Sequence, residues 1–130
     1  MSESILIYGG KSFGEIMEDG GLGWWIVNQS RAEHLEYAVL TRCLTQEWAT
    51  YDAEQGTAVM LCKLSNSVVK ANDSNRKCIG ISSYARINIP EFWQKMTNSQ
   101  RNPFKYIDTD ELLKELSPYL NKLEWQPFNG

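Results

Sequence analysis

The strongest constraint on the fold of this chain is a pair of long β-forming segments joined by a turn-rich connection. Residues 79–89 alternate along the two-residue period of a strand, and residues 57–69 form a second β-rich run. The connection between them contains Asn72-Asp73-Ser74-Asn75, residue types that favour turns. Two β runs separated by such a turn are typical of a hairpin, so the sequence predicts an antiparallel pair.

The alternation within residues 79–89 also predicts which side chains share a face. The apolar or small set consists of Ile79, Ile81, Ser83, Ala85, Ile87 and Ile89. The intervening set consists of Gly80, Ser82, Tyr84, Arg86 and Asn88. Successive side chains of a strand point to opposite faces, so we expect the first set in the core. The second face then presents Tyr84 and Arg86 to water or to a ligand.

Shorter segments predict the remaining elements. The expected short strands include 5–8, 24–28 and 104–107. Residues 36–43 fit either a helix or a strand, because periodicity does not separate short apolar runs, and we favour a short helix followed by a strand at 37–41. Residues 44–56 are expected to form a loop, residues 91–103 an irregular or briefly helical segment, and residues 119–128 a tail packed on the body.

Pairs of residues spaced three apart mark the start of each expected helix. These N-terminal pairs are Ser12 with Glu15, Ser30 with Glu33, and Asp108 with Glu111. We expect Gly20-Gly21 to stop the first helix and Pro118 to close the third.

These elements predict an α+β fold, with a curved, mainly antiparallel mixed sheet or small barrel and short flanking helices. The chain has 130 residues, of which 42% are hydrophobic and 22% charged. That length and composition are typical of a globular protein with a substantial core, so we expect a single domain over residues 1–130.

Several classes of protein are disfavoured by the sequence. No apolar run approaches the roughly 18 residues that a membrane span requires, and the apolar run 5–8 is too short for a signal peptide. We therefore expect a cytoplasmic protein with no membrane contact. Cys43, Cys62 and Cys78 contain no C-x-x-C pair, so we predict no metal site and no cofactor.

Catalytic motifs are also sparse. His34 is the single histidine, and it lies between Glu33 and Glu36 in a short segment expected to be a solvated helix. The two glycine clusters, Gly9-Gly10 and Gly20–Gly23, lack the residues of a phosphate-binding loop. We predict no catalytic residue, and a small enzyme that pairs His34 with a cysteine or carboxylate through folding stays an alternative.

Charge is segregated along the chain. Residues 1–56 carry nine acids and three bases, or −6, whereas residues 57–107 carry two acids and eight bases, or +6. The remaining residues, from Asp108, carry five acids and two bases, which completes the net charge of −3. Such asymmetry is typical of a face that binds a charged partner.

The basic middle segment predicts a binding surface. Tyr84 and Arg86 share a strand face, and the nearby cations expected to steer a polyanion are Lys63, Lys70, Arg76 and Lys77. Further cations are interleaved with aromatic residues downstream: Lys95, Arg101 and Lys105 with Trp93, Phe104 and Tyr106. Cations that hold phosphates and aromatic rings that stack on bases indicate a nucleic-acid partner. The isoelectric point near 5.2 argues against binding through charge alone.

The order of these segments resembles PUA-like domains, including the EVE and ASCH branches. The residues that carry the resemblance are Trp24-Trp25-Ile26-Val27-Asn28, the capped helix from Ser30, and Gly56–Leu61 paired with Ile79–Ser82. The resemblance spans residues 22–107. It implies a small mixed barrel that recognises RNA or modified DNA bases. It also implies that Trp24, Trp25, Asn28, Ser30 and Arg31 line a pocket.

The leading hypothesis is therefore a non-catalytic recognition domain for RNA or modified DNA. Its site would lie between the Trp24–Arg31 segment and the face that carries Tyr84 and Arg86. Arg31 and Arg86 would hold a phosphate or a polar base edge. The second hypothesis is a protein-interaction or oligomerisation module, in which the acidic and basic segments pair between copies or with a partner protein.

Overall fold

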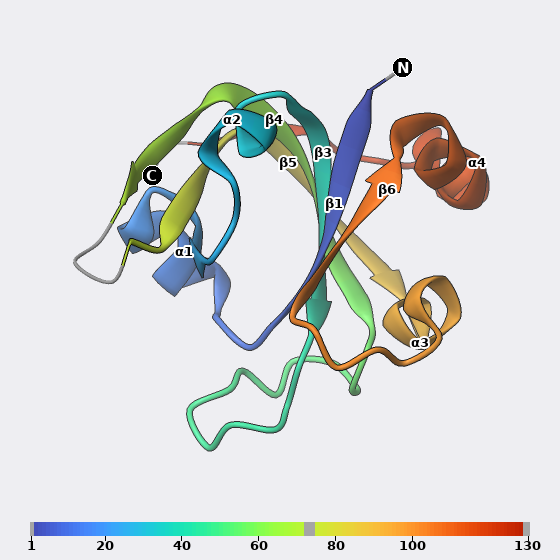
Figure 1. The fold of residues 1–130 in the computed structure, drawn as a ribbon. Helices are drawn as coiled ribbons and strands as arrows, with labels where there is room; N and C mark the ends of the chain where they lie inside the picture. The colour runs from blue at the N-terminus through green and yellow to red at the C-terminus, as the bar shows by residue number, and fades with distance from the viewer. Residues whose placement is uncertain (1, 72–74, 129–130) are drawn as a thin grey trace.

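A curled mixed sheet forms a half-barrel with short helices packed around it (Figure 1), in a computed structural model that describes residues 2–71 and 75–128. The architecture is α+β, as predicted. The strands are β1 (Glu3–Gly9), β2 (Gly21–Trp25), β3 (Leu35–Arg42), β4 (Ala58–Ala71), β5 (Lys77–Ile89), β6 (Phe104–Asp108) and β7 (Gln126–Pro127). The helices are α1 (Phe13–Asp19), α2 (Gln29–Ala32), α3 (Phe92–Thr97) and α4 (Thr109–Leu120).

The strand order within the described residues is β2-β5-β4-β3-β1-β6, with β7 paired to β5. Strands β4 and β5 form the predicted antiparallel hairpin, while β1 and β3 run parallel. The turn predicted between β4 and β5 falls largely on residues 72–74, outside the described residues. Because β2 and β6 are the ends of this order, the half-barrel is open between them.

The two faces of the sheet carry different cores. Alternate residues of each inner strand point to opposite faces, so Ile5 and Ile7 lie on one face and Leu6 on the other. The face of Leu6 is covered by α3 and α4, and we call it the helix-covered face. The face of Ile5 and Ile7 receives Ile16 from α1 and Leu22 from β2, and we call it the open face.

The prediction that alternate residues of β5 share one core face along the whole strand is wrong. Lys63 pairs with Ser83 but Leu64 pairs with Ile81, so β5 has one extra residue at this point. A single-residue bulge exchanges the faces of all side chains beyond it. Ile81 therefore packs on the open face, whereas Ile87 packs on the helix-covered face.

Helix α1 begins and ends as the sequence predicts. The Ser12 hydroxyl accepts from the Glu15 amide at 3.2 Å, and the Glu15 carboxylate accepts from the Ser12 amide at 3.1 Å. Gly20 ends the helix with φ of 79°, a left-handed conformation that glycine adopts without a steric penalty.

Helix α4 also begins as predicted but ends later. The Asp108 carboxylate accepts from the Glu111 amide at 3.2 Å. Pro118 lies inside the helix, which ends at Leu120, so the predicted end at Pro118 is wrong. A proline removes one helical hydrogen bond near the end, and the last residues continue the turn.

The region around α2 differs from the prediction in two ways. Asn28 caps the helix by accepting from the Arg31 amide at 2.9 Å, so the predicted cap at Ser30 is wrong. The strand predicted at residues 24–28 is displaced to Gly21–Trp25. The glycines belong to the strand because β2 lies very close to β5. A β-carbon at Gly21 would come within 2.2 Å of the carbonyl oxygen of Ile79.

The tail packs back on the body through β7, which pairs with Ser83 and Tyr84 of β5. Among the described residues, no helix combines the length and apolar character needed to cross a bilayer.

Candidate ligand-binding cavity

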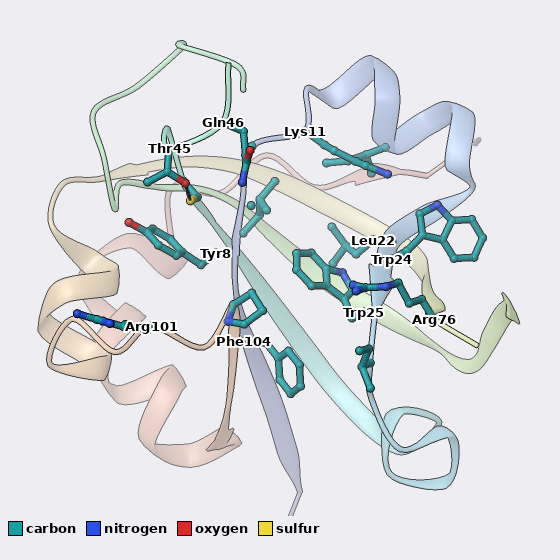
Figure 2. A pocket seen from close by; sticks show the side chains of 18 of the residues that line it. Tyr8, Lys11, Leu22, Trp24, Trp25, Thr45, Gln46, Arg76, Arg101 and Phe104 are labelled. Carbon is teal, nitrogen blue, oxygen red and sulfur yellow. Dashed lines mark hydrogen bonds between the residues drawn. The ribbon is translucent and has the colours of Figure 1, made fainter. Parts of the chain in front are cut away.

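A cavity of about 1040 Å³ opens where the half-barrel is incomplete (Figure 2). Residues 22–26 of β2 and its extension form one wall, and Phe104 at the start of β6 belongs to the opposite wall. Residues 8–11, at the end of β1, and the loop after β3 complete the lining. The cavity is therefore a direct consequence of the unpaired edges β2 and β6.

Trp25 crosses this opening. A β-carbon at Gly9 would lie 3.5 Å from Cη2 of Trp25, so the indole reaches from β2 to the end of β1. The ring also packs against the core of the open face. Its Nε1 is buried and has no hydrogen-bond partner in the structure. An unpaired buried donor costs about 1–3 kcal/mol, so this group favours a ligand that offers an acceptor.

Apolar and polar groups are separated within the cavity. The apolar lining comes from Ile16, Leu22, Leu40, Trp25 and Phe104. The polar lining includes Cys43 and also Tyr8, Thr45 and Gln46, which lie toward one side in Figure 2. This division suits a flat ligand with an apolar face and a polar edge.

Tyr8 is fixed in place by a stacking contact of its ring and a hydrogen bond at its hydroxyl. Its ring stacks on Trp93 with centroids 4.7 Å apart and an interplanar angle of 2°. Its hydroxyl accepts a hydrogen bond from Nε2 of Gln55. Burial raises the pKa of the Tyr8 hydroxyl above 10, and the adjacent Cys43 thiol raises it further. Tyr8 therefore remains a neutral phenol at physiological pH.

The loop after β3 is held by a buried arginine. The Arg42 side chain is 0% exposed and makes two hydrogen bonds to Asp52, at 2.6 and 2.9 Å. Arg42 also donates to the carbonyl of Lys11 at 2.5 Å. Gly10 permits this close packing, because a β-carbon there would lie 2.9 Å from that of Ala49. These contacts hold in place the loop after β3, which forms part of the cavity wall.

Three cations lie among the residues that line the cavity: Lys11, Arg76 and Arg101. Lys11 is paired with Asp19 at 2.5 Å. Arg76 and Arg101 are exposed and come from connections that are distant in sequence, on opposite sides of the opening in Figure 2. The rim therefore offers positive charge on both sides.

Only part of the predicted site converges on the cavity. Trp24 and Trp25 line it, and so does Arg76. Asn28 caps α2 and Ser30 is exposed on that helix, and neither lines the cavity. Arg31 makes a bidentate contact with Glu3 at 2.8 and 2.6 Å and stacks 3.7 Å above the Tyr106 ring.

Tyr84 and Arg86 lie away from this cavity. The Tyr84 hydroxyl donates to Oε1 of Gln126 at 3.2 Å, and its ring meets Phe128 edge-on. Arg86 stacks 3.8 Å above the Phe13 ring and lines a second cavity of about 550 Å³. The C-terminal tail therefore packs against Tyr84, whereas Arg86 lines the second, smaller cavity.

The other predicted cations are also dispersed. Lys63 is exposed and lies 4.3 Å above the Trp125 ring. Lys77 is buried and donates to the backbone and side-chain oxygens of Asn75, at 2.9 and 2.8 Å. The side chain of Lys70 lies outside the described residues. The basic middle segment therefore does not form one continuous face around the cavity.

Several lining residues were not singled out from the sequence. They are Tyr8, Cys43, Thr45, Gln46, Trp48 and Gln100. Trp48 carried a usable signal, since it is a tryptophan in a polar segment, and it is 59% exposed. Phe104 and Arg101 belonged to the predicted aromatic and basic constellation, and both line the cavity.

The side chains most relevant to catalysis are separated. His34 is exposed at the turn before β3, outside both cavities, whereas Cys62 is buried in the core of the open face. Burial raises the pKa of the Cys62 thiol strongly, which disfavours the reactive thiolate. Within residues 2–71 and 75–128, no three His, Cys, Asp or Glu side chains are grouped to hold a metal ion.

Comparisons with models of protein families, with curated proteins and with solved structures found no match to this chain.

Proposed function

We propose that this protein is a non-catalytic recognition domain that takes one unpaired base of RNA or DNA into the cavity between β2 and β6. The observation that carries the proposal is an open, aromatic-lined cavity of about 1040 Å³ with cations at its rim. The PUA-like resemblance of the sequence supports the same class of ligand, including modified bases.

The composition of the cavity fits a base. A base has apolar faces that stack on aromatic rings, and each stacked base contributes about 1–3 kcal/mol to single-strand binding. Phe104 supplies aromatic surface within the cavity, and Trp24 supplies more at its wall. The polar lining near Tyr8 supplies hydrogen-bonding groups for the base edge.

The rim fits the backbone of a single strand. Arg76 and Arg101 are exposed on either side of the opening, where the phosphates flanking an inserted base would pass. Contacts to phosphate position a strand without reading its sequence. The proposal therefore assigns affinity to the rim and selectivity to the cavity.

The test is a titration of tryptophan fluorescence with short single-stranded and duplex RNA and DNA at several salt concentrations. We expect single strands to quench the emission, and duplexes of the same length to bind more weakly. Arg101→Ala should weaken binding and reduce the slope of log K against log salt by about 1. Lys114→Ala, an exposed cation on α4, is the matched control and should leave the slope unchanged.

The alternatives give different results in the same experiment. Absence of binding by every oligonucleotide would overturn the proposal. Equal affinity for duplex and single strands would also overturn it, because a paired base cannot enter the cavity.

A further inference from the structure

The two neighbouring tryptophans of β2 differ in how their indole groups are used. Both line the cavity, but the Nε1 of Trp25 is buried and has no hydrogen-bond partner. Buried donors in folded proteins are nearly always paired, so such a group requires an explanation. Neighbouring groups cover Nε1 itself, so an acceptor reaches it only when they shift, and a ligand seated in the cavity beside Trp25 supplies such an acceptor.

We propose that Trp25 is a specificity-determining residue, whose indole N–H donates a hydrogen bond to an acceptor on the edge of the inserted base. This inference rests on the proposed function, since it names how the same cavity selects its ligand. The acceptor is a keto oxygen or an unprotonated ring nitrogen, the two acceptor types that base edges present.

The geometry of the indole defines the contact. An indole N–H lies in the plane of its ring, so an acceptor must approach the Trp25 Nε1 within this plane. The base therefore meets that atom with its edge and not with its face. The benzene end of the indole is fixed near Gly9, which limits rotation of the ring.

The polar groups of the cavity near Tyr8 complete the description of how a base edge would be contacted. Tyr8 is held by Trp93 and Gln55, and its raised pKa keeps the hydroxyl protonated. Gln46 is exposed on the loop and adjustable. Trp25 and Tyr8 are therefore donors held in place at the cavity, and the loop supplies adaptable contacts.

The experiment follows the indole protons directly. The five tryptophans give five indole N–H resonances in a ¹H–¹⁵N spectrum, assigned by single Trp→Phe variants. We titrate the unaltered protein with single-stranded pentamers of each base. On binding, we expect the Trp25 proton to move to lower field and to exchange more slowly with solvent. The Trp24 proton should not show this pair of changes.

Binding selectivity gives the second measurement. The tightest pentamer is compared with the same strand in which a non-polar isostere that cannot accept hydrogen bonds replaces the central base. Unaltered protein and Trp125→Phe, altered at a tryptophan outside the cavity, should prefer the natural base by roughly 2- to 10-fold, the range expected for one neutral hydrogen bond. Trp25→Phe should show a smaller preference than either, because it lacks the indole donor while the polar groups near Tyr8 remain.

The outcomes separate this inference from the proposed function. If pentamers bind but Trp25→Phe retains the preference, or the Trp25 proton does not move, Trp25 is not the reading group and the recognition function stands. If no pentamer binds, both proposals fail. Should Trp25→Phe fail to fold, the spectra of the unaltered protein decide the question.

Discussion

The two faces of the same sheet are packed in opposite ways. On the helix-covered face, Leu112 and Leu116 of α4 and Trp93 of α3 are each at most 2% exposed. On the open face, Trp24 and Trp25 remain only partly buried and border a cavity of about 1040 Å³. Alternating side chains of the same strands supply both faces, so the difference lies in what packs against them.

The cause is the number and length of the covering elements. Helix α4 has 12 residues and places Leu112 and Leu116 one turn apart against the sheet. On the open face, α1 has seven residues and buries Ile16. The half-barrel also ends at β2 and β6 without joining them. Complete cover produces a structural core, whereas incomplete cover leaves apolar surface available for a ligand.

The largest effect should come from truncating a side chain on the helix-covered face. Leu116→Ala should lower the free energy of unfolding by about 2–5 kcal/mol, because it removes buried apolar surface and leaves a void. Ile26→Ala, at a cavity wall and 68% exposed, should change it by no more than about 0.5 kcal/mol. Urea denaturation of both variants measures the contrast, and similar losses would remove the distinction between the faces.

A smaller effect should come from the polar contacts that hold the loop after β3, which forms part of the cavity wall. Asp52→Asn leaves the buried Arg42 guanidinium without its ionic partner, and should cost about 1–3 kcal/mol. Asp52 reaches solvent, which keeps the cost below that of a fully buried pair. Hydrogen exchange should accelerate mainly in the loop after β3. Glu54→Gln in the same loop is the control; an equal loss there would argue against the Arg42 contact.

The smallest effect should appear at the edge of the sheet, where Arg31 contacts Glu3. The hydrogen bond from Arg31 holds the Glu3 pKa below its ordinary value of 4.5. Its stabilisation is therefore present above about pH 4.5 and is lost as pH falls through the lowered pKa. The pair is exposed, so the effect is small. Thermal melting between pH 6 and 3 should show a shallower fall for Glu3→Gln than for the unaltered protein. Glu18→Gln should follow the unaltered curve.

Local interactions were the predictable part of the fold. The capping pair Ser12 with Glu15 and the left-handed Gly20 fixed both ends of α1, because each depends on residues only a few positions apart. The β4–β5 hairpin followed from two β runs and a short turn. Local signals failed where a competing residue lay nearby, as at α2, where Asn28 caps the helix in place of Ser30.

The candidate site was predicted only in part. Trp24 and Trp25 were identified from the sequence, but Tyr8 and Gln46 reach the same cavity from distant segments, and Arg31 is diverted to Glu3. No spacing in the sequence indicates that β2 and β6 stay unpaired, or that the tail covers Tyr84. Those outcomes depend on the path of the whole sheet.

By itself, the sequence determined both ends of α1, the start of α4, the central hairpin and the α+β class, because short-range hydrogen bonds and side-chain periodicity specify them. The tertiary structure decided which faces the side chains of β5 occupy, since one extra residue opposite Lys63 and Leu64 exchanges them. It also decided where the cavity lies. A cavity is defined by the packing that is missing between distant elements, and that information is not contained in any local pattern.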